Sequence, residues 1–91
     1  MNSATKTVGT NITAPAILWP KNDKRTFLLI QNQSTDDVLV NVGAYPSINN
    51  GLKIPAGETW NPVNPPKGEI RMVGILANPV WQTVYSIEET A

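Results

Sequence analysis

Residues 24–43 read KRTFLLIQNQSTDDVLVNVG, and this stretch decides the fold class. The run FLLI at 27–30 is typical of a short strand that is buried on both faces. Residues 32–37 are rich in Asn, Ser and Asp, whose side chains bond to the nearby backbone and favour a turn. Valine occupies every second position of residues 38–42, which is the pattern of a strand. The stretch therefore predicts two strands joined by a polar turn.

The same alternation of short apolar runs and turns continues on both sides. Eight prolines and six glycines leave few windows long enough for a helix of average length. Turn signals recur about every ten residues, which is the spacing of a sandwich or small barrel. Besides 26–31 and 38–42, strands are predicted at 6–13, 16–19, 52–54, 69–75 and 80–87, which gives seven. If residues 58–60 also form a strand, the number is eight.

The predicted fold class is therefore all-β. It is a small antiparallel β-sandwich or jelly-roll-like barrel of seven to eight short strands, in one domain that covers residues 1–91. Within it, residues 1–5 are expected to form a flexible N-terminal arm, 6–87 the sandwich and 88–91 a C-terminal tail.

The length and composition indicate a protein that binds to something larger. A chain of 91 residues buries only about 60–65% of its surface on folding, and without cysteine no disulfide can add stability. Oligomerisation or binding to a larger surface is the remaining route. Seven basic and seven acidic residues cancel, so the chain has no strong field to attract nucleic acid. No apolar stretch approaches the roughly 20 residues of a membrane-spanning helix.

The residue types needed for most catalytic and metal sites are missing. Nucleophilic catalysis usually needs histidine, and zinc sites need Cys and His, but the chain has neither residue. Asp36-Asp37 is better explained by a turn, and Lys67-Gly68 lacks the phosphate-binding pattern around it. We therefore expect no enzyme activity, no catalytic residues, no cofactor and no metal. A small hydrolase with a Ser–Lys arrangement is the least favoured alternative.

The aromatic residues have three interpretations. They pack in the core, they form a protein contact surface, or they form a platform on which sugars stack. Tyr45 lies in a loop of Gly, Pro and Asn and is the aromatic side chain most expected to be exposed, while Trp81 and Tyr85 fall on one face of the last strand. The candidate contact residues are Tyr45, Pro46, Trp60, Pro65, Pro66, Trp81 and Tyr85.

Residues 24 to about 87 resemble small structural proteins of phages and prophages. In that pattern an arginine precedes a hydrophobic strand that ends in Ile-Gln-Asn, and a polar turn leads to a Val-rich strand that ends in Gly. Residues 50–60 (NGLKIPAGETW) resemble its continuation, a short strand followed by an Ala-Gly turn and an aromatic residue. Arg25 is expected to bond across to a loop, Gln31 to end its strand at the rim, and Asn32 to satisfy a turn. The structural positions are Arg25, Gln31, Asn32, Gly43, Gly51 and Gly57.

The resemblance implies a β-sandwich that decorates a capsid or belongs to a head or tail fibre. The expected function is a non-catalytic capsid decoration (cement) protein, made in the host cytoplasm and located on the capsid surface of the virion. Its partner would be the major capsid protein, and its own state a homotrimer, with a dimer as second choice. The alternatives are a fibre or tail module that binds host carbohydrate or receptor, with Tyr45, Trp60 or Trp81 as the stacking surface, and a tail or neck component of the same virion.

Overall fold

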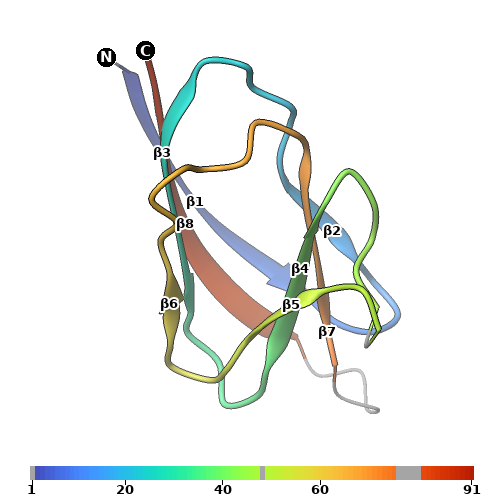
Figure 1. The fold of residues 1–91 in the computed structure, drawn as a ribbon. Helices are drawn as coiled ribbons and strands as arrows, with labels where there is room; N and C mark the ends of the chain where they lie inside the picture. The colour runs from blue at the N-terminus through green and yellow to red at the C-terminus, as the bar shows by residue number, and fades with distance from the viewer. Residues whose placement is uncertain (1, 48, 76–80) are drawn as a thin grey trace.

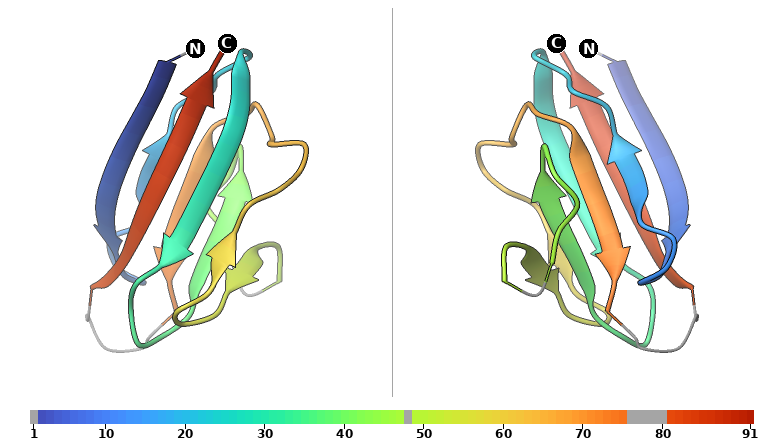
Figure 2. Two further views of the ribbon diagram at one scale, coloured as in Figure 1. Left: turned by 90° about the vertical axis from the view of Figure 1, so that its left-hand side faces the viewer. Right: turned by 90° about the vertical axis from the view of Figure 1, so that its right-hand side faces the viewer.

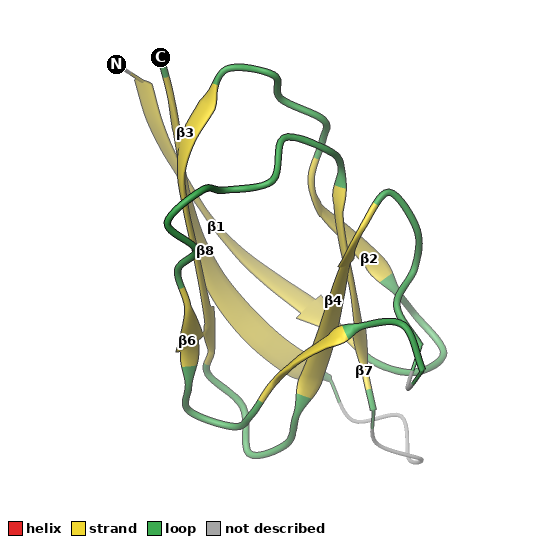
Figure 3. Ribbon diagram, in the orientation of Figure 1, coloured by secondary structure: helices red, strands yellow, loops and turns green. Residues whose placement is uncertain are grey.

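The protein is an antiparallel β-sandwich, one of the two architectures that the sequence predicts (Figures 1 and 3). The computed structural model describes residues 2–47, 49–75 and 81–91, and these contain eight strands and no helix. One sheet has the strand order β1-β8-β3-β6 and the other β2-β7-β4-β5. The strands are β1 (Asn2–Thr10), β2 (Ala16–Trp19), β3 (Arg25–Asn32), β4 (Val38–Val42), β5 (Leu52–Ile54), β6 (Thr59–Trp60), β7 (Ile70–Gly74) and β8 (Gln82–Thr90).

The core fills the space between the two sheets, which Figure 2 shows as two layers. Period-two alternation puts every second residue of each strand on the inner face. The first sheet contributes Leu28, Ile30 and Val84, all fully buried. The second sheet contributes the other buried core residues, namely Leu18, Trp19, Val38, Val40, Ile54, Ile70 and Met72. A hydrogen bond from Nε1 of Trp19 to Oγ of Ser86 (2.8 Å) also joins the two layers.

Both ends of the chain differ from the prediction. The sequence predicts a loose arm at 1–5, but β1 begins at Asn2 and pairs with β8 along its whole length, so that Asn2 lies opposite Thr90. The expected tail at 88–91 is also part of this ladder as far as Thr90. The pairing is made by backbone groups, which any residue supplies, so the polar sequence of residues 2–7 did not reveal the strand. The predicted start of the last strand, Val80, lies outside the described residues.

Strand β3 is buried on one face only, whereas the sequence predicts burial on both. Leu28 and Ile30 are fully buried in the core. Phe27 and Leu29 point to the outer face of the sheet and are only half-buried. The sandwich has two layers (Figure 2), so among the described residues no third layer covers the outer apolar face of β3.

Arg25 closes one end of the sandwich. An irregularity between Arg25 and Phe27 places Arg25 opposite Thr90 and Phe27 opposite Glu89, so the extra residue Thr26 turns the arginine toward the inner face. Its fully buried guanidinium donates from Nε to Oε2 of Glu88 (2.8 Å). The other nitrogens donate to the carbonyl oxygens of Pro20 (2.8 Å), Gly68 (3.0 Å) and Pro66. Arg25 therefore makes the predicted bonds to loops, and it joins two loops to β8.

Asn32 makes similar side-chain hydrogen bonds at the opposite end of the sandwich. Its fully buried side chain donates from Nδ2 to the carbonyl oxygens of Asp36 (2.8 Å) and Ile54 (2.9 Å), and Oδ1 accepts from the backbone of Ser34 (2.9 Å). Ile54 belongs to the other sheet, so Asn32 satisfies the turn, as predicted, and also bridges the layers. Beside it, Gly57 has a φ of +78°, which glycine adopts without strain.

The remaining structural positions lie at turns and at a rim. Gln31 is the last residue but one of β3, opposite Thr59 and Tyr85. Gly43 directly follows β4 with a φ of +81°. Gly51 directly precedes β5 and lies close to Pro46.

Candidate binding surfaces

Charged side chains are dispersed over the described residues rather than gathered. Those residues contain no group of three or more acidic, His or Cys side chains placed to hold a metal ion. They also contain no helix of the length and hydropathy that a membrane span requires. The features that stand out are two apolar surfaces, one on the outer side of each sheet.

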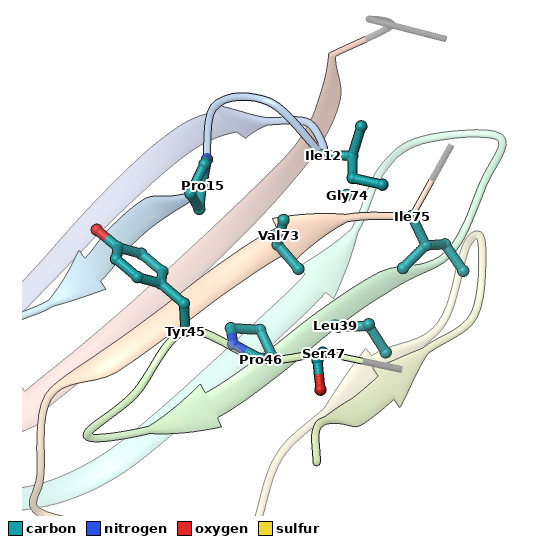
Figure 4. A pocket seen from close by; sticks show the side chains of 9 residues that line it. All are labelled: Ile12, Pro15, Leu39, Tyr45, Pro46, Ser47, Val73, Gly74 and Ile75. Carbon is teal, nitrogen blue, oxygen red and sulfur yellow. The ribbon is translucent and has the colours of Figure 1, made fainter. Parts of the chain in front are cut away.

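The first surface is a groove on the outer face of the β2-β7-β4-β5 sheet (Figure 4). Its floor contains Leu39 of β4 and Val73 of β7, which are cross-strand partners. The β1–β2 loop and the β4–β5 loop form its walls. The volume is about 470 Å³, and the lining residues are Ile12, Pro15, Leu39, Tyr45, Pro46, Ser47, Val73, Gly74 and Ile75.

The wall formed by the β4–β5 loop is held in place by a close backbone approach. A Cβ atom at Gly51 would lie 2.8 Å from Cβ of Pro46 and 3.2 Å from the carbonyl oxygen of Ser47, so only glycine fits without a shift. Oδ1 of Asn50 accepts hydrogen bonds from the backbone (2.7 Å) and hydroxyl (3.0 Å) of Ser47. At the rim, the guanidinium of Arg71 lies 4.5 Å from the centroid of the Tyr45 ring. Tyr45 is thus fixed at the groove while 42% of its surface stays exposed.

The second surface is on the outer face of the β1-β8-β3-β6 sheet. We call it the outer-sheet patch and define it as Phe27, Leu29, Trp81, Tyr85 and Ile87. Leu29 lies directly opposite Ile87, and Tyr85 is opposite Gln31 on the same face. Trp81 directly precedes β8 and lies against β1, since a Cβ atom at Gly9 would be 3.1 Å from its ring. It is 58% exposed, and the other four side chains are half-buried.

The structure divides the predicted contact residues between these surfaces. Tyr45 and Pro46 line the groove, whereas Trp81 and Tyr85 belong to the outer-sheet patch on the other sheet. Trp60 lies opposite Ile30, where it is half-buried and packs against the core, and it belongs to neither of the two surfaces.

The two prolines predicted as contact residues lie in a loop that is bonded to the end of the sandwich. Pro65 and Pro66 are half-buried in the β6–β7 loop, and the carbonyl oxygen of Pro66 accepts a hydrogen bond from Arg25. The sequence analysis did not name several apolar residues that point outward from the strands. Their strands carry apolar residues on both faces, and this pattern could have identified them. They are Leu39 and Val73 in the groove and Phe27, Leu29 and Ile87 in the patch.

Comparison with known proteins found no matching family model, no matching curated protein and no matching solved structure.

Proposed function

We propose that this protein is a non-catalytic decoration (cement) protein of a bacteriophage, which binds the outer surface of the assembled capsid and stabilises it by bridging subunits. One observation carries the proposal. Strand β3 has large apolar side chains on both faces, and among the described residues those on the inner face are buried whereas Phe27 and Leu29 on the outer face are only half-buried. Together with the exposed Trp81, these half-buried side chains form a contiguous, partly exposed apolar surface, and such a surface on a small protein indicates a site that another molecule covers.

The outer-sheet patch has the composition of a protein-binding interface. Such interfaces combine a centre enriched in aromatic residues and depleted of charge with a polar rim. Here Leu29, Tyr85 and Ile87 occupy the centre. Thr5 and Thr7 lie beside them on β1, opposite Ile87 and Tyr85, and Gln31 lies on the other side. Glu89, opposite Phe27, is a charged residue at the end of the patch, and with the uncharged Thr5, Thr7 and Gln31 it gives the polar rim that a contact with another protein requires.

The choice of the capsid as partner rests on the resemblance of residues 24 to about 87 to small phage structural proteins. Stabilisation of the capsid by such a protein needs no catalytic step. A protein that binds the assembled shell but not free subunits shifts the assembly equilibrium toward the shell by mass action. The net charge of zero is compatible with crowding many copies on one surface, because the copies do not repel one another.

We expect particles that lack this protein to assemble but to break at a lower temperature or under milder osmotic shock. The measurement is release of the genome during a thermal ramp, with and without purified protein added back. Equal stability of the two kinds of particle would contradict the cementing role.

A pair of variants tests which surface docks. Trp81→Ala combined with Tyr85→Ala removes two aromatic side chains of the outer-sheet patch, and it should weaken binding to particles by roughly 100-fold. Tyr45→Ala truncates an exposed aromatic side chain at the groove on the other side of the sandwich and should bind like the unmodified protein. Circular dichroism checks that both variants fold. A loss of binding only in Tyr45→Ala would transfer the docking site to the groove.

Binding of host carbohydrate by a fibre module is the second candidate. It is favoured by the exposure of two aromatic rings, Trp81 at 58% and Tyr45 at 42%. The two rings lie on opposite outer sides of the sandwich, Tyr45 in the β4–β5 loop and Trp81 directly before β8, and so present one stacking surface each, which makes this candidate the weaker one. Binding of the purified protein to a host polysaccharide on a glycan array, with no binding to particles, would favour it over the capsid.

A further inference from the structure

Strand β1 is a long, open sheet edge. It is the terminal strand of its sheet, it has nine residues, and it pairs with β8 without any shift of register. The three other edge strands are shorter. β6 has two residues and β5 three, while β2 has four, a register shift, and Pro20 directly after it. Short or irregular edges resist pairing with another chain, whereas a long regular edge is a template for it.

The ladder identifies the backbone groups that this edge leaves free. The carbonyl oxygen of Thr83 accepts from the backbone of Gln33 (2.9 Å), and its N–H donates to Oγ of Ser34, so Thr83 directs its backbone groups toward the side of β3. Because these directions alternate along an antiparallel strand, the even-numbered residues of β8 bond to β1. Their partners in β1 are also even-numbered. The N–H and C=O groups of Ser3, Thr5, Thr7 and Gly9 therefore point away from the sheet.

Nothing in the sequence of β1 blocks this edge. The strand contains no proline, and Lys6 carries its only charge. The Lys6 ammonium is turned toward its own chain, where Nζ donates to the carbonyl oxygen of Leu18 (3.0 Å) and lies 4.4 Å from the centroid of the Trp19 ring. Charged side chains and prolines are the usual protection of natural edge strands.

We propose that β1 pairs antiparallel with β1 of a second copy of this chain, which joins the two first sheets into one continuous sheet. A twofold axis makes such a contact self-complementary, since the same outward groups meet on both sides. The chain has a net charge of zero, so two copies have no long-range repulsion to overcome.

Charge and exposure select the register. An axis through Lys6 would set the two lysines directly opposite each other, which like charges disfavour. An axis through Thr5 places Lys6 opposite Ala4 and gives the bonded pairs Thr5–Thr5 and Ser3–Thr7. A dimer about the Thr5 axis pairs residues 2–8 of the two copies, and residues 2–7 are exposed. An axis through Thr7 would instead require Thr10 to pair, and Thr10 is fully buried. The outer-sheet patches of the two copies then lie on the same face of the joined sheet.

Single-cysteine variants test this register cleanly, because the chain has no cysteine of its own. In the proposed dimer, the two Thr5 Cα atoms lie roughly 5.5 Å apart, within the range that a disulfide spans. Thr5→Cys should therefore form a disulfide-linked dimer rapidly under mild oxidation. Thr35→Cys, at an exposed threonine of the β3–β4 turn, is the matched control and should link slowly. Equal rates would overturn the pairing, and rapid linking of Thr7→Cys alone would overturn the register.

A second variant separates pairing from folding. Thr5→Pro removes an N–H that points away from β8, so the β1–β8 ladder stays intact while the contact between copies loses two hydrogen bonds. The dissociation constant of the dimer, measured by sedimentation, should rise roughly tenfold, with the circular dichroism spectrum unchanged. Unmodified protein that sediments as a monomer up to about 1 mM would overturn the proposal. These measurements use purified protein without capsids, so their outcome is independent of the proposed cementing role.

Discussion

Replacing Arg25 by alanine is expected to lower the free energy of unfolding by roughly 3–5 kcal/mol, because it leaves a buried carboxylate without its partner. Glu88 lies on the inner face of β8, and its side chain is 10% exposed. The variant also removes the donor for three loop carbonyl groups. Small domains are stable by only about 5–15 kcal/mol in total, so much of that margin would be lost. Urea unfolding followed by tryptophan fluorescence measures the change.

Three variants show whether the charge or the geometry matters. Lys24→Ala removes an exposed neighbouring cation and should change stability little. Arg25→Lys keeps the charge but cannot reach Glu88 and the loop carbonyls together, so it should lose most of the stabilisation. Arg25→Met combined with Glu88→Leu leaves no unpaired charge and should be more stable than Arg25→Ala. If Arg25→Ala unfolds at the same urea concentration as Lys24→Ala, the anchoring role of Arg25 is wrong.

Replacing Asn32 by alanine should lower the free energy of unfolding by roughly 2–4 kcal/mol. The variant removes three side-chain hydrogen bonds at a fully buried position and leaves the carbonyl group of Ile54 without this donor. Asn32→Asp should be at least as destabilising, because it replaces a donor that faces two carbonyl oxygens by an acceptor.

The matched control for Asn32 is Asn64→Ala, at an exposed asparagine of the β6–β7 loop. Thermal unfolding by circular dichroism should rank the four proteins as unmodified, Asn64→Ala, Asn32→Ala and Asn32→Asp, from most to least stable. A midpoint for Asn32→Ala that equals that of Asn64→Ala would contradict the bridging role of Asn32.

The proposed pairing through β1 and the proposed docking through the outer-sheet patch are compatible. The pairing uses the edge of the first sheet, whereas docking uses its outer face. A joined sheet would present two patches in a fixed relation. Two linked contacts on one capsid surface bind more tightly than one, because the second contact is intramolecular.

Much of the fold could be predicted because local rules determine it. The strands at 16–19, 38–42 and 52–54 have the predicted bounds, since apolar alternation and the flanking Pro, Gly and Asn define each segment without distant information. The structural places of Arg25 and Asn32 were also predicted, although the sequence did not name Glu88 or Ile54 as their partners. Those partners are 63 and 22 residues away along the chain, and only folding brings them close.

The sequence by itself determined that this chain is all-β, with short antiparallel strands in a sandwich or small barrel, because strand periodicity and turn residues are local features of the sequence. The choice of the sandwich came from the arrangement of the two sheets. The tertiary structure decided the remainder. Residues 2–7 became a strand because β8 offers backbone partners, which side-chain patterns do not encode. The run at 27–30 is apolar on both faces, as the sequence indicates, but only the arrangement of the sheets buries one face fully and leaves the other half-buried. Coverage depends on what packs against a strand, and that is a property of the assembled layers rather than of any one segment.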